Sequence, residues 1–112
     1  MPLINVMVSC THVDNAKSLI KELSAELSKA TGKPEQYVMC LLQTGISMQF
    51  AGNDAPCCYI EIKSIGALNP PAMSKTFCHL IEARIGIPAD RIYIGFEDVA
   101  ASKWGFNNKT FG

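Results

Sequence analysis

The sequence predicts an α+β fold, in which two strand–helix–strand units form one four-stranded mixed sheet with two helices on one face. Three observations lead to this fold class: four short apolar segments typical of strands, two longer segments with helical periodicity, and a weak internal repeat. The chain has 112 residues, the length of one ordinary domain, so we expect a single domain over residues 1–112.

The first unit begins with residues 3–8, which are mostly apolar and β-branched, as in a strand covered on both faces. Residues 15–31 carry apolar side chains at helical spacing and charged ones mostly on the other side, which predicts an amphipathic helix. Asp14 is the candidate N-cap. Gly32 suits a left-handed C-terminal cap, and Pro34 cannot continue the helix.

The second strand is expected over residues 37–42, and the turn residues of segment 44–52 suggest a short hairpin arm. Residues 57–65 are predicted to form the third strand, because apolar and polar side chains alternate from Tyr59 onward.

The second helix is expected to start at Asn69-Pro70, a cap followed by a first helical position, and to end before Gly86. Its apolar stripe consists of Met73, Phe77, Leu80, Ile81 and Ile85. The fourth strand is expected over residues 91–96, and the aromatic tail 97–112 is too short to form a domain.

The repeat relates the two units. Gly32-Lys33-Pro34 and Gly86-Ile87-Pro88 each precede a strand, so each unit should have parallel strands joined by a helical crossover. Both helices can then cover one face of the sheet. The other face is apolar too, as segments 3–8 and 37–42 indicate, and no further helix is available for it. A second copy of the chain is the economical cover.

Composition excludes several classes of protein. Ten acidic and ten basic residues balance, so no nucleic-acid partner is expected. Charged residues make up only 18% of the chain, which favours apolar surface buried between subunits. The chain contains no apolar stretch of about 18 residues, so no transmembrane helix is expected. The first residues lack the features of a signal peptide, so we expect a cytoplasmic protein.

Five cysteines, an odd number without disulfide-framework spacing, are expected to be reduced thiols. A redox role for the neighbouring Cys57 and Cys58 is the least favoured hypothesis. His12 and His79 have no partner motif, so no metal site is expected.

Pro2 follows Met1, which is normally removed before so small a residue. A free N-terminal proline carries a secondary amine, whereas an internal proline carries an amide without basicity. Burial beside a cation lowers the pKa of such an amine and would leave a neutral general base near pH 7. The alternative is that Pro2 only permits processing and starts an edge strand.

The sequence resembles the macrophage migration inhibitory factor family of the tautomerase superfamily. The matching pieces are spread in order along nearly the whole chain: Met1-Pro2, Thr31-Gly32-Lys33-Pro34, Tyr37-Val38-Met39, Met48 with Phe50, Pro56-Cys57, Ser64-Ile65-Gly66, Asp90-Arg91-Ile92-Tyr93-Ile94, and Asn107-Asn108-Lys109-Thr110-Phe111.

The resemblance implies a homotrimer in which three four-stranded sheets surround a barrel-like core and the helices lie outside. It also implies keto–enol tautomerase activity on phenylpyruvate-type 2-oxo acids and dopachrome-type compounds, without a cofactor. The alternative is a cytokine-like signalling protein with vestigial tautomerase activity, exported without a signal peptide and recognised by a host or cell-surface receptor.

By the same resemblance, Pro2 matches the catalytic base and Lys33 the cation that binds the substrate carboxylate. Ile65, beside Ser64, matches a residue that offers its backbone N–H. Tyr93 matches a pocket tyrosine donated by the neighbouring subunit. Tyr37 and Phe111 match pocket-lining aromatics.

Several of these residues also have a purely structural explanation. Lys33 suits a solvated position beside a helix C-terminus. Ser64 and Ile65 could simply end a strand, and Tyr93 could be a core aromatic of its strand.

Several positions depart from the family pattern. Gly95 stands where many relatives have asparagine, which removes one side-chain hydrogen bond to substrate. Trp104 and Phe106 reshape the pocket rim, so the preferred substrate size is open.

Other departures concern activities besides tautomerisation. Ile60 replaces the second cysteine of the animal redox motif, which begins at Cys57. His12 and Gly45 replace an arginine and an aspartate tied to receptor recognition in the animal cytokines. These positions support neither a redox nor a cytokine role.

Overall fold

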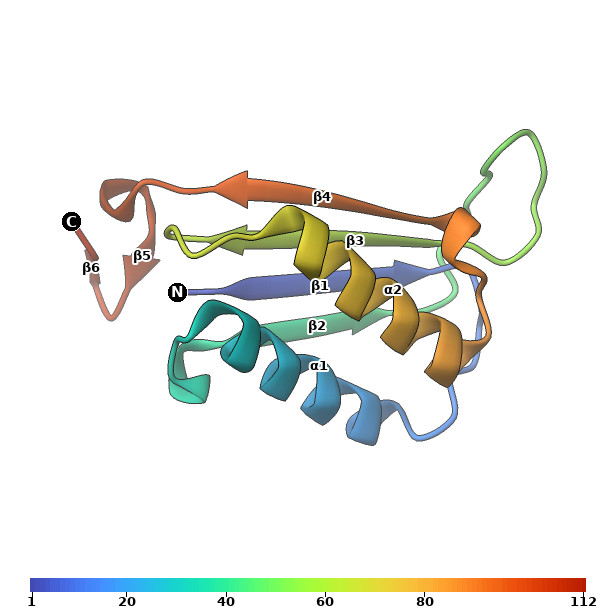
Figure 1. Cartoon of the computed structure of the whole chain (residues 1–112), viewed down its shortest axis with the longest axis horizontal. Helices are drawn as coiled ribbons and strands as arrows, with labels where there is room; N and C mark the ends of the chain where they lie inside the picture. Colours follow the sequence, from blue (N-terminus) through green and yellow to red (C-terminus); the bar gives the residue numbers. More distant parts are fainter.

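The computed structural model describes residues 1–112 and shows one four-stranded sheet with two helices on one of its faces (Figure 1). The main elements are β1 (Leu3–Val8), α1 (Ala16–Thr31), β2 (Met39–Gln43), β3 (Cys58–Ser64), α2 (Pro70–Ile85) and β4 (Ile92–Asp98). Short 3₁₀ turns occupy Glu35–Tyr37, Ala89–Arg91 and Ala101–Lys103, and a small hairpin of β5 (Gly105–Phe106) and β6 (Lys109–Thr110) ends the chain.

The strand order is β2-β1-β3-β4. β1 pairs with β2 in parallel, β3 pairs with β4 in parallel, and the two central strands β1 and β3 are antiparallel. The predicted mixed sheet of two strand–helix–strand units is therefore confirmed, with the two units joined through their first strands.

The start of α1 corrects a detail of the prediction. Asn15, not Asp14, precedes the helix, with a left-handed φ of 53° and no capping hydrogen bond from its side chain. Asp14 instead contacts the His12 ring nitrogen at 2.8 Å. Asparagine tolerates the left-handed region, which explains how the helix can begin one residue later than expected. Gly32 caps the C-terminus as predicted, with φ 71°.

The caps of α2 agree with the sequence. The Asn69 side chain accepts a hydrogen bond from the Ala72 N–H at 3.4 Å, and Pro70 is the first helical residue. Gly86 ends the helix in the left-handed conformation. Neither helix is long and apolar enough to cross a membrane.

The second strand begins later than residue 37, because residues 35–37 form a 3₁₀ turn. The Tyr37 N–H donates to the Pro34 carbonyl at 3.0 Å, and pairing with β1 begins only where the Met39 N–H donates to the Pro2 carbonyl at 3.1 Å. The hairpin arm expected over 44–52 is wrong. That segment holds only an isolated bridge between Phe50 and Asn53.

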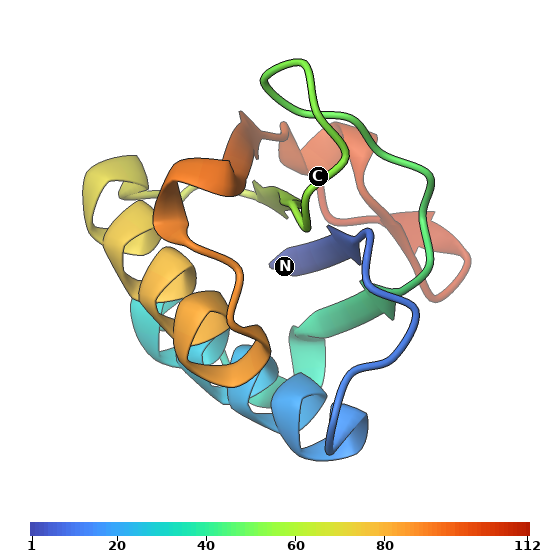
Figure 2. The same cartoon turned by 90° about the vertical axis from the view of Figure 1, so that its right-hand side faces the viewer.

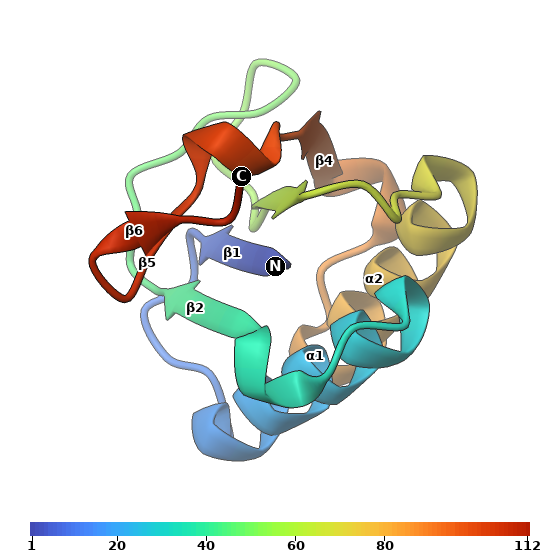
Figure 3. The same cartoon turned by 90° about the vertical axis from the view of Figure 1, so that its left-hand side faces the viewer.

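The core lies between the sheet and the two helices. Ile4, Val6 and Val8 of β1 alternate with outward-facing residues and are fully buried. They form one core cluster with the apolar stripes of both helices. Figures 2 and 3, which view the molecule from its two ends, show both helices on the same face of the sheet. The buried residues of these stripes are Leu19, Leu23 and Leu27 of α1 and Met73, Phe77, Leu80 and Ile81 of α2.

The other face carries no helix, as predicted, and Met39 and Leu41 on β2 remain 60% and 36% exposed. The prediction that this face is apolar too holds only for part of it, because a polar row crosses its centre. The Gln43 side chain donates to Asn5 at 2.8 Å, and Asn5 donates to Glu61 at 3.5 Å. Every second residue of β1 and β3 faces this side, including these polar ones.

Candidate active site

Pro2 lies immediately before β1 and is buried. Its carbonyl accepts the Met39 N–H, which ties the start of the chain to β2. Figure 3 faces this end of the molecule and shows the N-terminus at its centre, with the C-terminal hairpin nearby. Because β3 and β4 run antiparallel to β1, their C-terminal ends also reach this end.

Lys33 is held beside the N-terminus by the turn that follows α1. Its carbonyl accepts a hydrogen bond from the Ser28 hydroxyl at 2.6 Å, and its N–H donates to the Thr31 hydroxyl at 3.3 Å. The pKa of the Met1 amine is lowered, first by burial and then by the positive charge of Lys33. The charge of Lys33 is therefore felt at the start of the chain, next to Pro2.

Ser64 and Ile65 end β3 at the same end of the sheet. Ser64 is fully buried, its carbonyl accepts the Val99 N–H at 2.9 Å, and its hydroxyl has no hydrogen-bond partner. After Ile65 the chain turns at Gly66, which has φ 69° and donates its N–H to Asp98 at 2.9 Å. The turn fixes where the backbone of Ile65 lies.

Tyr37 and Phe111 come together through a third aromatic residue. Phe106 packs edge-on against Tyr37, with ring centroids 6.1 Å apart, and stacks on Phe111 at 5.4 Å. The hairpin that carries Phe106 turns at Asn107 and Asn108, which both adopt positive φ, as a type I′ turn requires. Phe106, which the sequence analysis treated only as a change of the pocket rim, therefore links the two aromatic residues predicted for the site.

Tyr93 lies at the opposite end of the sheet. It pairs with Tyr59, its ring packs edge-on against Phe50 at 4.8 Å, and it is 65% exposed. In Figure 1, β4 begins at the end far from the N-terminus. One chain does not bring Tyr93 to Pro2, and Tyr93 is not the core aromatic of the structural alternative.

Gly95 on β4 lies beside Tyr59 on the neighbouring strand β3. A methyl group added to Gly95 would come 3.2 Å from the Tyr59 hydroxyl. That hydroxyl also lies 3.4 Å from the Glu61 carboxylate and donates to it. Tyrosine at position 59 therefore leaves little room for a side chain at position 95.

Two further cations lie near the Pro2 end and were not singled out from the sequence. Lys63 stands opposite Leu3 in the β1–β3 register and lines a hollow of about 280 Å³ with Lys103 and Trp104. Neither lysine forms an ion pair, although Glu97 lines the same hollow. The sequence did contain one indication of Lys63, because this residue directly precedes the Ser64-Ile65 motif.

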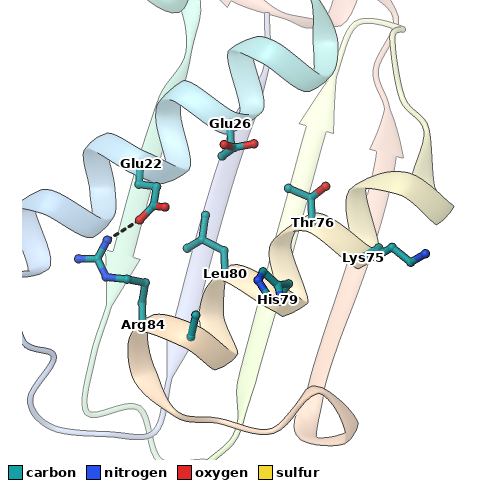
Figure 4. Close-up of a pocket in the computed structure, with 8 residues that line it drawn as sticks. Glu22, Glu26, Lys75, Thr76, His79, Leu80 and Arg84 are labelled. Carbon is teal, nitrogen blue, oxygen red and sulfur yellow. Dashed lines mark hydrogen bonds and ion pairs between the residues drawn. The ribbon is translucent and has the colours of Figure 1, made fainter.

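A larger hollow of about 540 Å³ lies between α1 and α2 on the outer side of the molecule (Figure 4). An ion pair between Glu22 and Arg84 bridges the helices there, and His79 and Lys75 line the hollow from α2. It contains none of the site residues predicted from the sequence, and its charges are of both signs.

The cysteines are all free thiols. Burial raises the pKa of Cys58 to about 12, with smaller contributions from neighbouring thiols, and raises the pKa of Cys40 to about 11. Because the thiolate is the reactive form, these two residues are poorly suited to redox chemistry near neutral pH. No group of three His, Cys, Asp or Glu side chains is arranged to hold a metal ion.

Comparison with known families agrees with this fold. The family model described as Macrophage migration inhibitory factor (MIF) matches residues 1–112. The chain belongs to the macrophage migration inhibitory factor family.

Individual MIF relatives match over the same extent. The chain is 34% identical to macrophage migration inhibitory factor of Meriones unguiculatus, with 99% of each chain covered. It is 33% identical to the macrophage migration inhibitory factor homolog of Brugia malayi, with 100% of each covered. Among solved structures, the homologue from Prochlorococcus marinus is 54% identical and superimposes with a TM-score of 0.94, covering 98% of this chain and 99% of that one.

Proposed function

We propose that this protein is a keto–enol tautomerase in which Pro2, after removal of Met1, is the general base. The observation that carries the proposal is the Met1 amine, whose pKa is lowered by partial burial and by the charge of Lys33. Pro2 is more buried than Met1, so its own amine would feel the same two effects. Its neutral form would be available to accept a proton near pH 7.

The other residues of this end support the remaining steps. Pro2 removes a proton from the carbon next to the keto group and returns it on oxygen, or the reverse. Lys33 binds the substrate carboxylate, and the backbone N–H of Ile65 binds a substrate oxygen. The aromatic group of Tyr37, Phe106 and Phe111 offers an apolar wall, which suits phenylpyruvate-type 2-oxo acids and dopachrome-type compounds.

We propose further that the active form is a homotrimer in which the open sheet faces surround a common core. Tyr93 is exposed and lies far from Pro2 in its own chain, so it would complete the site of a neighbouring subunit. The exposed Met39 and Leu41 would be buried by the same contact.

The test compares two forms of the same chain in a phenylpyruvate enolisation assay. One form has Met1 removed, as confirmed by intact mass. The other keeps Pro2 in a peptide bond through a short N-terminal extension. We expect the extended form to lose about 10²–10⁴-fold in kcat/KM, the typical contribution of positioned proton transfer.

The extension retains every side chain, so it isolates the amine. A Pro2→Gly variant, which keeps a free but primary amine, is expected to fall between the two forms. Equal activity of the processed and extended forms would contradict the proposal.

A second function, cytokine-like signalling, is favoured by the names of the relatives, which are macrophage migration inhibitory factors. Its test is cell-surface receptor binding by the processed protein and by the Pro2→Gly variant. Binding that is fully retained by Pro2→Gly while its tautomerase activity falls would separate signalling from catalysis, and binding by neither form would exclude the signalling function.

A further inference from the structure

The hydroxyl of Ser64 is the one buried side-chain polar atom in the chain that lacks a hydrogen-bond partner. Ser64 is 0% exposed and is the last residue of β3, whose buried face is otherwise apolar. Folded proteins pair nearly all buried polar groups, because an unpaired hydroxyl loses its hydrogen bonds to water without compensation. The exception at Ser64 therefore needs an explanation.

The register of the central strands places Ser64 next to Pro2. Leu3 lies opposite Lys63 and Ile4 opposite Ile62 in the antiparallel pair. Extending this register by one residue brings Pro2 opposite Ser64. Both residues are buried, in phase with the residues that face the helices, so their side chains share one side of the sheet. Cβ atoms in such a pair are about 4.5–5.5 Å apart.

We propose that Ser64 is a positioning residue whose Oγ accepts a hydrogen bond from the N–H of Pro2 once Met1 has been removed. This inference rests on the proposed function. While Met1 is attached, Pro2 has no N–H to donate, which explains why the hydroxyl is unpaired. Removal of Met1 creates the missing donor at the adjacent position.

The hydrogen bond would orient the base. A neutral pyrrolidine nitrogen carries one hydrogen and one lone pair. When Ser64 holds the hydrogen, the lone pair points away from the buried side of the sheet, toward a bound substrate. As the substrate C–H bond breaks, that lone pair forms a second N–H bond. The first N–H stays on Ser64, and the second proton is the one returned to the substrate.

The proposal makes a signed prediction for Ser64→Ala. A hydrogen-bond acceptor favours the protonated form of an amine, so its loss lowers the pKa of Pro2 and moves the acid limb of the pH–rate profile to lower pH. The lone pair also loses its fixed orientation, so kcat falls about tenfold while KM changes little.

The experiment uses processed wild-type, Ser64→Ala and Ser64→Thr proteins. We expect Ser64→Thr, which keeps the hydroxyl, to restore most of kcat. The Pro2 pKa is followed by NMR titration with ¹³C-labelled proline, a readout that does not require activity. In the extended form, where Pro2 cannot donate, Ser64→Ala should be at least as heat-stable as wild type.

The outcomes separate this inference from the proposed function. Inactive processed wild type would overturn the tautomerase proposal, whereas the NMR titration would still decide the hydrogen bond. An active enzyme whose kcat and Pro2 pKa are both unchanged by Ser64→Ala would overturn the inference alone. A lower pKa together with a lower kcat would support it.

Discussion

The two faces of the sheet differ in how far one chain buries them. The face toward α1 and α2 is completely covered by the helices, because the inward residues of β1 and the core residue Phe77 are fully buried. The other face leaves Met39, Leu41 and Tyr93 substantially exposed around a polar row. The contrast teaches that one chain completes only one face of its sheet, and the open face is the one that we propose further copies of the chain cover.

The largest loss of stability is expected from a substitution on the face that the helices cover. Phe77→Ala removes a fully buried ring from the core and should lower the free energy of unfolding by about 3–5 kcal/mol, measured by urea denaturation. The matched control is Phe106→Ala on the exposed C-terminal hairpin, which should cost far less. Similar losses at both positions would mean that burial within one chain does not distinguish the two regions.

On the open face, Leu41→Lys should leave the chain folded but weaken its assembly. An unpaired charge buried against another copy is costly, so we expect the dissociation constant of the assembly to rise about 100-fold, followed by sedimentation. Ser18→Lys, at an exposed position of α1, is the control. A wild-type protein that sediments as a single subunit would remove the proposed role of this face.

At the end of the sheet that carries Pro2, Lys33→Met should change both substrate binding and pH dependence. The substrate carboxylate loses its positively charged partner, so KM should rise about tenfold. Lys33 lowers the pKa of the neighbouring amine, so its removal raises that pKa, and the acid limb of the kcat/KM profile moves to higher pH. Lys29→Met, also near the end of α1, serves as control. An unchanged acid limb in Lys33→Met would argue against coupling between Lys33 and the N-terminal amine.

Periodicity and capping residues predicted the elements well, because they report burial and backbone conformation over a few neighbouring positions. The apolar stripes of both helices, the caps at Gly32 and Gly86, and the Asn69-Pro70 start were all confirmed. The second strand was misplaced, because a local 3₁₀ turn captured Tyr37 before strand pairing could begin.

The candidate site was predictable in part. The sequence itself pointed to Pro2 through the chemistry of an N-terminal secondary amine, and family resemblance supplied Lys33, Ile65 and Tyr93. The contact between Phe106 and Tyr37 could not be predicted from the sequence, because it joins segments that are far apart in the chain.

The sequence by itself determined the elements, the helix-covered face and the residue types available for chemistry. Only the tertiary structure decided that β1 and β3 lie antiparallel at the centre, which sets Asn5 opposite Glu61 and, when the register is extended by one residue, Pro2 opposite Ser64. Strand pairing depends on contacts between residues about sixty positions apart, whereas a hydrophobic pattern records only which side of its own segment is buried.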